Sequence, residues 1–330
     1  MKPAVLVARA VFPDVVERLS VHFEVDDNPN DAVFSPAELT RQLQGKVGAF
    51  TTGSERIDAD LLAANPQLRV VANMAVGYNN FDVPACTARG VLCTNTPDVL
   101  TETTADFGFA LMMATARRIT ESEHFLRRGE WTKWSFDMFT GSDIHGATLG
   151  ILGMGRIGQA IARRGAHGFG MSVIYHNRSR LDAALEAGCR AAWVSKDALL
   201  RQADHLVLVL PYSPASHHAI GAAELALMKP TATLTNIARG GIVDDQALAQ
   251  ALSQRRIAAA GLDVFEREPS IHPDLLKLSN VVLTPHIASA SVATRRAMAN
   301  LAADNLIAAL GFGPNAGRPP TPINRELLTP

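Results

Sequence analysis

The chain has few cysteines, and their spacing does not suit a disulfide framework or a metal site. Cys86, Cys93 and Cys189 are an odd number, and the 330 residues contain no Cys-x-x-Cys pair and no Cys/His metal-ligand spacing. Cysteine is often buried in protein cores, so we interpret all three as small apolar core residues rather than reactive or metal-binding groups. We therefore expect no disulfide and no bound metal.

An excess of one charge and long apolar runs are also lacking. The 31 Lys and Arg residues nearly balance 32 Asp and Glu residues, which leaves a formal net charge of -1. Such a chain has no overall positive field to attract a nucleic-acid backbone or an anionic membrane. Its apolar runs end well before the roughly 18 residues of a membrane span, and its start lacks the features of a signal peptide. We expect a cytoplasmic protein without nucleic-acid or membrane partners.

Short β-branched segments alternate with helical segments along the whole chain, which is typical of parallel sheets built from βαβ units. The length of 330 residues suggests about two domains. In the first hundred residues we expect four strands and three helices, at 4–7, 47–51, 68–74 and 91–94 and at 13–22, 36–43 and 59–64. One long helix at 101–128 then leads into a second domain.

The second domain is predicted to contain six strands. They are expected at 148–152, 172–176, 205–210, 232–238, 258–264 and 281–284, with helices at 156–167, 181–187 and 244–256. The last helix, at 292–310, follows after this sheet is complete, so we expect it to pack on the first domain. Residues 311–330, rich in Gly and Pro, are expected to be irregular.

A Gly-x-Gly-x-x-Gly motif lies directly after the strand at 148–152 and opens an amphipathic helix. Gly153 allows a tight turn, Gly155 allows the backbone to approach a pyrophosphate, and Gly158 allows close packing of helix on strand. Arg156 and Ile157 begin the helix beside the expected phosphate. Because strand, motif and helix occur in the required order, we predict a dinucleotide site here.

The residues that follow the second strand of this unit predict which dinucleotide binds. They are His176, Asn177, Arg178, Ser179 and Arg180, and no Asp or Glu occurs between residue 156 and residue 182. An acidic residue here usually binds the ribose 2′-hydroxyl of NAD, whereas arginine accommodates the 2′-phosphate of NADP. We expect NADP(H) to be preferred and NAD(H) to be possible; in the alternative interpretation both arginines are merely solvated.

Three later strands end in residues that could perform chemistry. Arg239 ends the strand at 232–238, Glu268 follows the strand at 258–264, and His286 follows the strand at 281–284. Taken singly, an arginine, a glutamate or a histidine at such a position is more often a structural or solvent-exposed residue than a catalytic one. However, ligands of doubly wound sheets bind at the carboxyl ends of the strands, so these three residues are expected at one edge of the sheet.

These motifs together resemble the D-isomer-specific 2-hydroxyacid dehydrogenases, most closely the glyoxylate/hydroxypyruvate reductase branch that includes 2-ketogluconate reductases. Residues 75–82, residues 101–106 and the pair Leu210-Pro211 also carry the resemblance, which covers nearly the whole chain. It implies two doubly wound α/β parallel-sheet domains. Residues 101–289 would form a Rossmann dinucleotide-binding domain, and residues 1–100 plus 290–330 a smaller, discontinuous, flavodoxin-like substrate-binding domain.

The resemblance also implies roles for individual residues. Arg239 is expected to be the catalytic arginine, His286 the proton donor and Glu268 its acidic partner. The backbone N–H groups of Val76 and Gly77 are expected to bind the substrate carboxylate, with Arg239 and His286 also touching substrate. Further cofactor contacts are expected from Thr104, Leu210, Pro211, Ile237, Ala238, Asp263 and Ser289.

The chemistry of 2-keto acid reduction agrees with these roles. A hydride reaches the ketone carbon while the ketone oxygen needs a positive partner and then a proton, which Arg239 and His286 can supply. A carboxylate beside His286 favours the charged imidazolium, and Glu268 suits that purpose. We predict an NADPH-preferring reductase of glyoxylate, hydroxypyruvate or 2-ketogluconate; the alternative is a non-catalytic, dinucleotide-sensing module like the corepressors of this fold. Trp131 and Trp134 favour a homodimer, which the resemblance also implies.

Overall fold

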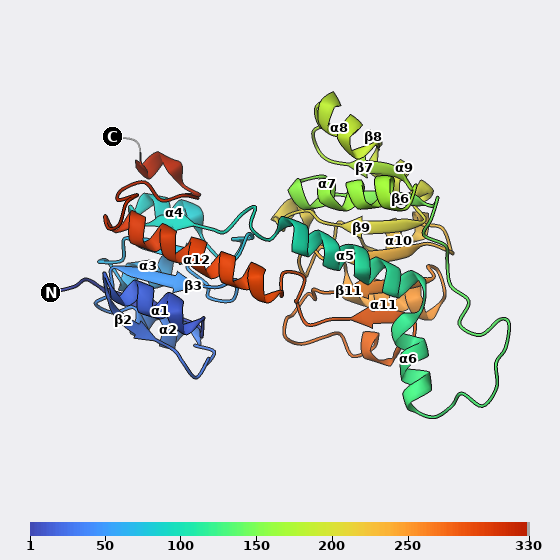
Figure 1. Ribbon diagram of the computed structural model, residues 1–330, viewed down its shortest axis with the longest axis horizontal. Coiled ribbons are helices and arrows are strands. Elements are labelled where there is room, and N and C mark those ends of the chain that lie inside the picture. Colours follow the sequence, from blue (N-terminus) through green and yellow to red (C-terminus); the bar gives the residue numbers. More distant parts are fainter. Residues whose placement is uncertain (329–330) are drawn as a thin grey trace. The chain divides into compact units, whose positions relative to one another are not determined.

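The computed structural model describes residues 1–328, and the chain divides into two compact units (Figure 1). Unit 1 consists of Met1–Leu100 and Ala290–Pro330, and unit 2 of Thr101–Ser289. Residues 329 and 330, the end of the expected irregular tail, lie outside the described residues. Both units are α/β layers around an all-parallel sheet, so the predicted fold class is confirmed.

Unit 1 contains a five-stranded sheet in the order β2-β1-β3-β4-β5. Its strands are β1 (Ala4–Val7), β2 (Glu24–Asp27), β3 (Gly48–Thr51), β4 (Val70–Asn73) and β5 (Leu92–Thr94). Its helices are α1 (Pro13–Ser20), α2 (Pro36–Gln42), α3 (Ala59–Ala64), α4 (Val83–Ala88) and α12 (Val292–Ala309), with a short 3-10 turn η4 (Arg325–Leu328).

The final long helix, α12, packs on the sheet of unit 1. One side of α12 buries Ala299, Ala302, Ala303 and Leu306 against sheet residues such as Val5. Figure 1 shows this helix lying along the sheet of unit 1, beside α1. The opposite face of the same sheet is covered by α2, α3 and α4. Residues far apart in the chain therefore build one core, which makes the unit discontinuous.

Unit 2 contains a seven-stranded sheet in the order β12-β11-β10-β9-β6-β7-β8. Its strands are β6 (Thr148–Leu152), β7 (Ser172–His176), β8 (Ala191–Trp193), β9 (His205–Leu208), β10 (Thr233–Asn236), β11 (Ala259–Leu262) and β12 (Val281–Leu283). Its helices are α5 (Thr101–Ala116), α6 (Ile119–Arg127), α7 (Arg156–Arg163), α8 (Ala183–Cys189), α9 (Lys196–Gln202), α10 (Ala222–Leu227) and α11 (Asp245–Ser253). Short helical turns are η1 (Arg164–Gly168), η2 (Pro214–Ser216) and η3 (Leu275–Lys277).

Helices cover both faces of the second sheet. On one face, α5 and α7 bury residues such as Phe109, Met112 and Ile161. On the other face, α9, α10 and α11 bury residues such as Leu199 and Leu248. Because all seven strands run parallel, their carboxyl ends lie at one edge of the sheet, and the loops that follow them share that edge.

The prediction of one helix at 101–128 is wrong, because the helix breaks into α5 and α6. Arg118 adopts a left-handed φ of +54° between the two helices. The backbone N–H of Ser142 donates a 2.9 Å hydrogen bond to the carbonyl of Ala116. In a continuing helix, this carbonyl would accept a hydrogen bond from the N–H four residues later. Arg118 also pairs with Glu121 of α6. A contact from a distant segment therefore ends α5.

Unit 2 contains seven strands, whereas six were predicted. In unit 1, strand β2 was also not predicted. The two missed strands, β2 and β8, lie at sheet edges. The sequence of β2 is Glu-Val-Asp-Asp and is largely exposed, and β8 has only three residues. Neither has the buried β-branched pattern that marks a central strand. The short helices α4, α9 and α10 were missed because six or seven residues show little periodicity.

Among residues 1–328 no helix combines the length and apolar character needed to cross a bilayer.

Candidate active site

The loop between β6 and α7 is built around three glycines. Gly153 has a φ of +103°, and a Cβ atom there would lie 2.6 Å from the backbone nitrogen of Leu210. A Cβ atom on Gly158 would lie 2.4 Å from the carbonyl oxygen of Gly153. Glycine is therefore required at both positions, by backbone geometry at the first and by close helix packing at the second.

The third glycine leaves open space at the start of a helix. Gly155 is the N-cap residue of α7 and is exposed, and a Cβ atom on it would meet nothing within 4 Å. Arg156 and Ile157 then begin α7, whose first N–H groups and dipole attract negative charge. On α5 of the same unit, the buried hydroxyl of Thr104 has no hydrogen-bond partner within residues 1–328. These features fit a dinucleotide, whose pyrophosphate this loop would hold.

The turn after β7 is fastened to the glycine loop. Asn177 Oδ1 accepts a 2.7 Å hydrogen bond from the backbone N–H of Met154, and its carbonyl accepts one of 3.1 Å from the indole of Trp193. His176 Nδ1 lies 2.9 Å from the carbonyl oxygen of Val194. The structure therefore brings the predicted 2′-recognition segment next to the predicted pyrophosphate loop.

The two arginines of this turn have different surroundings. Arg180 makes hydrogen bonds of 2.9 and 2.7 Å to Glu186, and the hydroxyl of Tyr175 donates one of 2.7 Å to the same carboxylate. These donors lower the pKa of Glu186 to about 2. By contrast, Arg178 and Ser179 are exposed, with no side-chain partner within residues 1–328. Glu186 was not expected as a partner of Arg180, because it lies beyond Asp182, outside the segment that predicts which dinucleotide binds.

Other residues expected at the cofactor follow strands of the same sheet. Leu210 and Pro211 come after β9, Ile237 and Ala238 come after β10 and are both buried, and Ser289 is half-buried near the end of unit 2. The structure brings them to the carboxyl ends of the strands. Their contacts with a cofactor stay a prediction.

Asp263, directly after β11, organises the loop that carries the candidate proton donor. It is fully buried, and its carboxylate accepts hydrogen bonds from Thr284 Oγ1 at 2.7 Å, Ile287 N at 2.8 Å and Ala288 N at 2.9 Å. Its carbonyl accepts a 2.9 Å bond from the backbone N–H of His286. Burial raises the pKa of Asp263, although these hydrogen bonds oppose the shift. The carboxylate therefore fixes the backbone on both sides of His286, which has a left-handed φ of +53°.

His286 and Glu268, which follow the neighbouring strands β12 and β11, form a close pair. His286 Nδ1 lies 2.7 Å from Glu268 Oε2, and Glu268 Oε1 accepts a 2.9 Å hydrogen bond from the backbone N–H of Phe265. Burial raises the pKa of Glu268, but the hydrogen bond and charge of His286 outweigh it, so the pKa lies below its usual range. The ionised carboxylate makes Nδ1 a donor and leaves Nε2 facing away from Glu268.

Arg239 is near enough to Glu268 for the two charges to interact. Its guanidinium donates a 2.7 Å hydrogen bond from Nη1 to the carbonyl of Ala238. Burial lowers the pKa of Arg239, and the charge of Glu268 opposes that shift; the side chain stays cationic at neutral pH. The chain can pass directly against the 265–268 segment because the next residue is Gly240, where a Cβ atom would lie only 1.7 Å from the carbonyl oxygen of Phe265.

In unit 1, the loop after β4 presents two backbone N–H groups. The side-chain amides of Asn95 and Asn73 donate hydrogen bonds of 2.8 and 2.9 Å to the carbonyls of Val76 and Gly77. The N–H groups of Val76 and Gly77 donate to no other group within residues 1–328. Paired N–H groups of this kind form a small anion-binding concavity.

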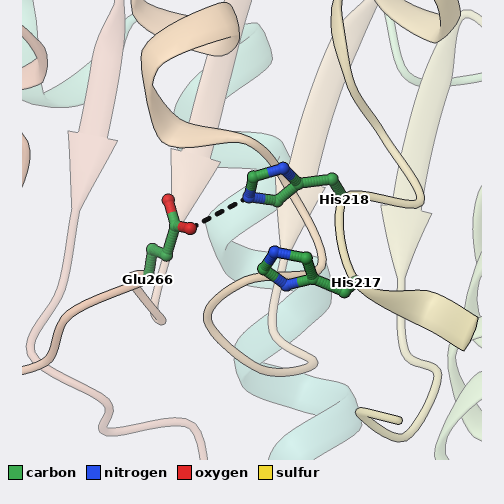
Figure 2. Close-up of side chains that lie close together, drawn as sticks. All are labelled: His217, His218 and Glu266. Atoms are coloured by element: carbon green, nitrogen blue, oxygen red, sulfur yellow. Dashed lines mark hydrogen bonds and ion pairs between the residues drawn. The ribbon is translucent and has the colours of Figure 1, made fainter. Parts of the chain in front are cut away.

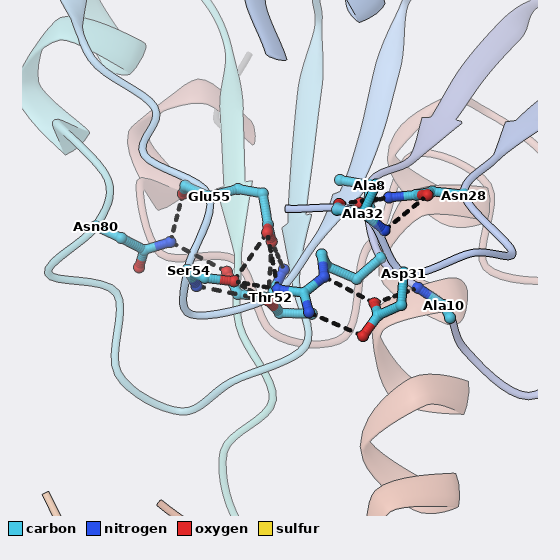
Figure 3. A network of polar contacts seen from close by, with 10 residues as sticks. Ala8, Ala10, Asn28, Asp31, Ala32, Thr52, Ser54, Glu55 and Asn80 are labelled. Atoms are coloured by element: carbon cyan, nitrogen blue, oxygen red, sulfur yellow. Dashed lines mark hydrogen bonds and ion pairs between the residues drawn. The ribbon is translucent and has the colours of Figure 1, made fainter. Parts of the chain in front are cut away.

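A polar network supports that loop from the neighbouring strands (Figure 3). Buried Glu55 accepts hydrogen bonds from Thr52, at 2.6 Å from its backbone and 2.8 Å from its hydroxyl. Arg9 lies 3.8 Å from Glu55 and makes a two-pronged ion pair with Asp31. Asn80 ties the loop down with bonds of 3.1 and 2.7 Å to the carbonyls of Thr52 and Glu55. The turn that carries the two N–H groups is thereby joined to the end of β3.

A seven-stranded parallel sheet with this glycine loop at its first βα turn defines the class of dinucleotide-binding proteins with a Rossmann fold. Residues 109–288 match the family described as "D-isomer specific 2-hydroxyacid dehydrogenase, NAD binding domain". The chain belongs to that family and is an oxidoreductase that uses a nicotinamide dinucleotide.

Curated relatives align along nearly the full length of the chain. The "Glyoxylate reductase" of Thermococcus onnurineus is 48% identical, with 99% of this chain and 98% of the relative covered. The "Glyoxylate reductase" of Aeropyrum pernix is 46% identical, with 99% and 97% covered.

Solved structures show the same fold. The NADPH-dependent glyoxylate/hydroxypyruvate reductase of Sinorhizobium meliloti, in complex with NADP and malonate, matches with a TM-score of 0.87 and 37% identity over 98% of this chain and 97% of that one. A glyoxylate reductase from Paecilomyes thermophila matches with a TM-score of 0.87 and 32% identity, covering 98% and 99%.

Proposed function

We propose that the protein is an NADPH-preferring reductase that converts small 2-keto acids to D-2-hydroxy acids. Glyoxylate and hydroxypyruvate are the leading substrates, and 2-ketogluconate is a bulkier candidate. The observation that carries the proposal is the 2.7 Å contact between His286 and Glu268 beside Arg239, at the edge of a dinucleotide-binding sheet. The names of the relatives from Thermococcus onnurineus and Sinorhizobium meliloti support it.

The proposed reaction divides the work among three side chains. Bound NADPH supplies a hydride to the ketone carbon. Arg239 orients the keto acid and stabilises the negative charge that develops on the ketone oxygen. His286 donates the proton from Nε2 to that oxygen, and Glu268 stabilises the imidazolium and holds the ring through Nδ1. The ring then regains its proton from water, and in the reverse direction neutral His286 acts as the base.

Unit 1 is proposed to bind the substrate carboxylate. The N–H groups of Val76 and Gly77 are already oriented, because the carbonyls of the same two peptide units, those of Ala75 and Val76, accept hydrogen bonds from the backbone N–H of Thr96 at 2.9 Å and from the side chain of Asn95 at 2.8 Å. An anchor made of backbone N–H groups leaves room for a small carboxylate. It adds no charged side chain, so it does not discriminate between 2-keto acids that differ only beyond the carbonyl. This arrangement suits a reductase of several short 2-keto acids.

The proposed NADPH preference depends chiefly on Arg178. Arg178 and Ser179 can donate hydrogen bonds to a 2′-phosphate, whereas Arg180 is occupied by Glu186. A charge-assisted hydrogen bond contributes about 1.5–3 kcal/mol, which corresponds to roughly 10- to 150-fold in specificity. NAD(H), which lacks the phosphate, is the second cofactor in this proposal.

We also propose a homodimer formed through the segment after α6. Trp131, Trp134 and Phe136 expose 55%, 75% and 83% of their surface. Three large apolar side chains so close in sequence favour burial against a second copy of the chain. Size-exclusion chromatography with light scattering checks this point; a monomer at micromolar concentration would contradict it.

The proposal is tested by steady-state assays with glyoxylate, hydroxypyruvate and 2-ketogluconate, each with NADPH and with NADH. We expect saturable oxidation of NADPH and a higher kcat/KM with NADPH than with NADH. An equal or higher kcat/KM with NADH would refute the cofactor assignment. Binding of NADPH without turnover of any 2-keto acid would instead favour a dinucleotide-sensing module.

A further inference from the structure

Two adjacent histidines and a glutamate meet in unit 2, and the proposed reaction uses none of these three side chains. His217 and His218 follow the turn η2, and Glu266 follows β11. One ligand atom from each residue lies within 4.8 Å of the others, and His218 Nε2 lies 2.9 Å from Glu266 Oε1. Figure 2 shows both imidazole rings on the same side, with the carboxylate directed at the ring of His218.

The backbone brings the two rings together. Neighbouring side chains on an extended chain point in opposite directions, but His218 has a left-handed φ of +49°, and its ring stacks on that of His217 with centroids 3.9 Å apart. The backbone N–H of His218 donates a 2.7 Å hydrogen bond to the carbonyl of Gly241. A Cβ atom on Gly241 would lie 3.3 Å from His217 Nδ1, so a residue without a side chain makes room for the first ring. A left-handed non-glycine residue is uncommon, and such residues concentrate at functional sites.

The neighbouring groups add further oxygen atoms. Asp244 Oδ2 lies 3.9 Å from His218 Nδ1, and the hydroxyl of Tyr212 lies 3.2 Å from His217 Nδ1. Neutral imidazole nitrogens together with a carboxylate are ligands that Zn²⁺ accepts, at about 2.0–2.2 Å from the metal. Two such imidazoles and one carboxylate leave a fourth position for water.

We propose that His217, His218 and Glu266 form a binding site for one Zn²⁺ ion. Tetrahedral coordination requires ligand atoms about 3.3 Å apart. No pair therefore needs to close by more than about 1.5 Å, and His218 and Glu266, whose atoms are 2.9 Å apart, need to separate slightly. The side chains of His218 and Glu266 are about one-third exposed, at 35% and 31%, and can make that adjustment through their rotamers. The metal joins the loop after η2 to the loop after β11. This site does not depend on the proposed reductase activity.

We expected no bound metal from the sequence, in which these three residues form no recognisable metal-ligand motif. Glu266 lies 48 residues after His218, and adjacent histidines do not have the spacing of known metal motifs. Only the fold of unit 2 brings the three residues together.

Isothermal titration calorimetry of the full-length, chelator-treated protein with zinc chloride tests the proposal. We expect one Zn²⁺ per chain with a Kd in the micromolar range or tighter. His217→Gln and Glu266→Gln should each weaken binding at least tenfold, because each removes one of three protein ligands. His145→Gln is the matched control: it removes an exposed histidine of the same unit outside the cluster and should leave the Kd unchanged.

A second readout separates this site from adventitious binding at the other histidines. Co²⁺ in place of Zn²⁺ should give absorption bands of a four- or five-coordinate centre in the wild type and lose them in His217→Gln. Circular dichroism of the metal-free variants should match the wild type, which shows that they are folded. The proposal is overturned if no saturable binding occurs, or if His217→Gln and Glu266→Gln bind Zn²⁺ as tightly as the wild type does.

Discussion

Replacing Asp263 by Asn tests whether a buried carboxylate sets the position of the proton donor. The carboxylate accepts three hydrogen bonds, from Thr284, Ile287 and Ala288, at 2.7 to 2.9 Å. Asparagine keeps one oxygen but places its NH₂ group opposite a backbone N–H, so one bond becomes a repulsive contact and the others lose their ionic component. Hydrogen bonds to charged groups contribute about 1.5–3 kcal/mol each, so we expect a loss of about 2–5 kcal/mol in the free energy of unfolding.

The same substitution should impair catalysis, because the loop on both sides of His286 loses its anchor. A displacement of about 1 Å at a reacting group can cost roughly 100-fold in rate. Urea unfolding and the kcat for glyoxylate measure the two effects. Asp58→Asn is the control, because Asp58 is an N-cap residue of α3, where asparagine is equally favourable. If Asp263→Asn retains both the stability and the kcat of the wild type, the anchoring argument is wrong.

Three further predictions concern cofactor choice, substrate binding and pH. Arg178→Ala should lower kcat/KM with NADPH about 10- to 150-fold and leave kcat/KM with NADH nearly unaffected, whereas Arg180→Ala should mainly lower the melting temperature. Steady-state kinetics with both cofactors and thermal unfolding distinguish the two variants. Equal effects of the two substitutions on kcat/KM with NADPH would contradict the assignment. Asn95→Ala should raise the KM for glyoxylate more than it lowers kcat, since it releases the carbonyl of Val76; a change in kcat alone would count against it. The pKa of Glu268 is lowered in the folded protein, so its stabilising effect is complete above the usual carboxyl range and is lost as the pH falls through the lowered value. Urea titrations should therefore show a larger stability difference between wild type and Glu268→Gln at pH 7 than at pH 3, and a constant difference would refute the linkage.

Much of the fold could be predicted from the sequence, because central parallel strands are buried on both faces and read as continuous apolar segments. The strands β1, β6 and β7 were predicted with the bounds that the structure shows. Edge strands lack that pattern, which is why β2 and β8 were missed. The break at Arg118 could not be predicted, because the hydrogen bond from Ser142 to Ala116 joins residues 26 positions apart.

Part of the candidate site could likewise be predicted from the sequence, and part could not. Arg239, Glu268 and His286 were recognisable because each follows a strand, and parallel strands end at one edge of a sheet. The ion pair of Arg180 with Glu186 and the contact of His218 with Glu266 depend on how loops fold back, which no local pattern encodes. Side-chain partners in loops are therefore the part that only the structure provides.

The central claim is that His286 delivers the proton to the oxygen of the substrate carbonyl that is reduced. The most direct test compares kcat for the reduction of glyoxylate by NADPH, near pH 7, in the wild type and in His286→Ala. Positioned proton transfer contributes about 10²- to 10⁴-fold, so the variant should lose at least a hundredfold while still binding NADPH. A variant that keeps more than about a tenth of the wild-type kcat would contradict the account.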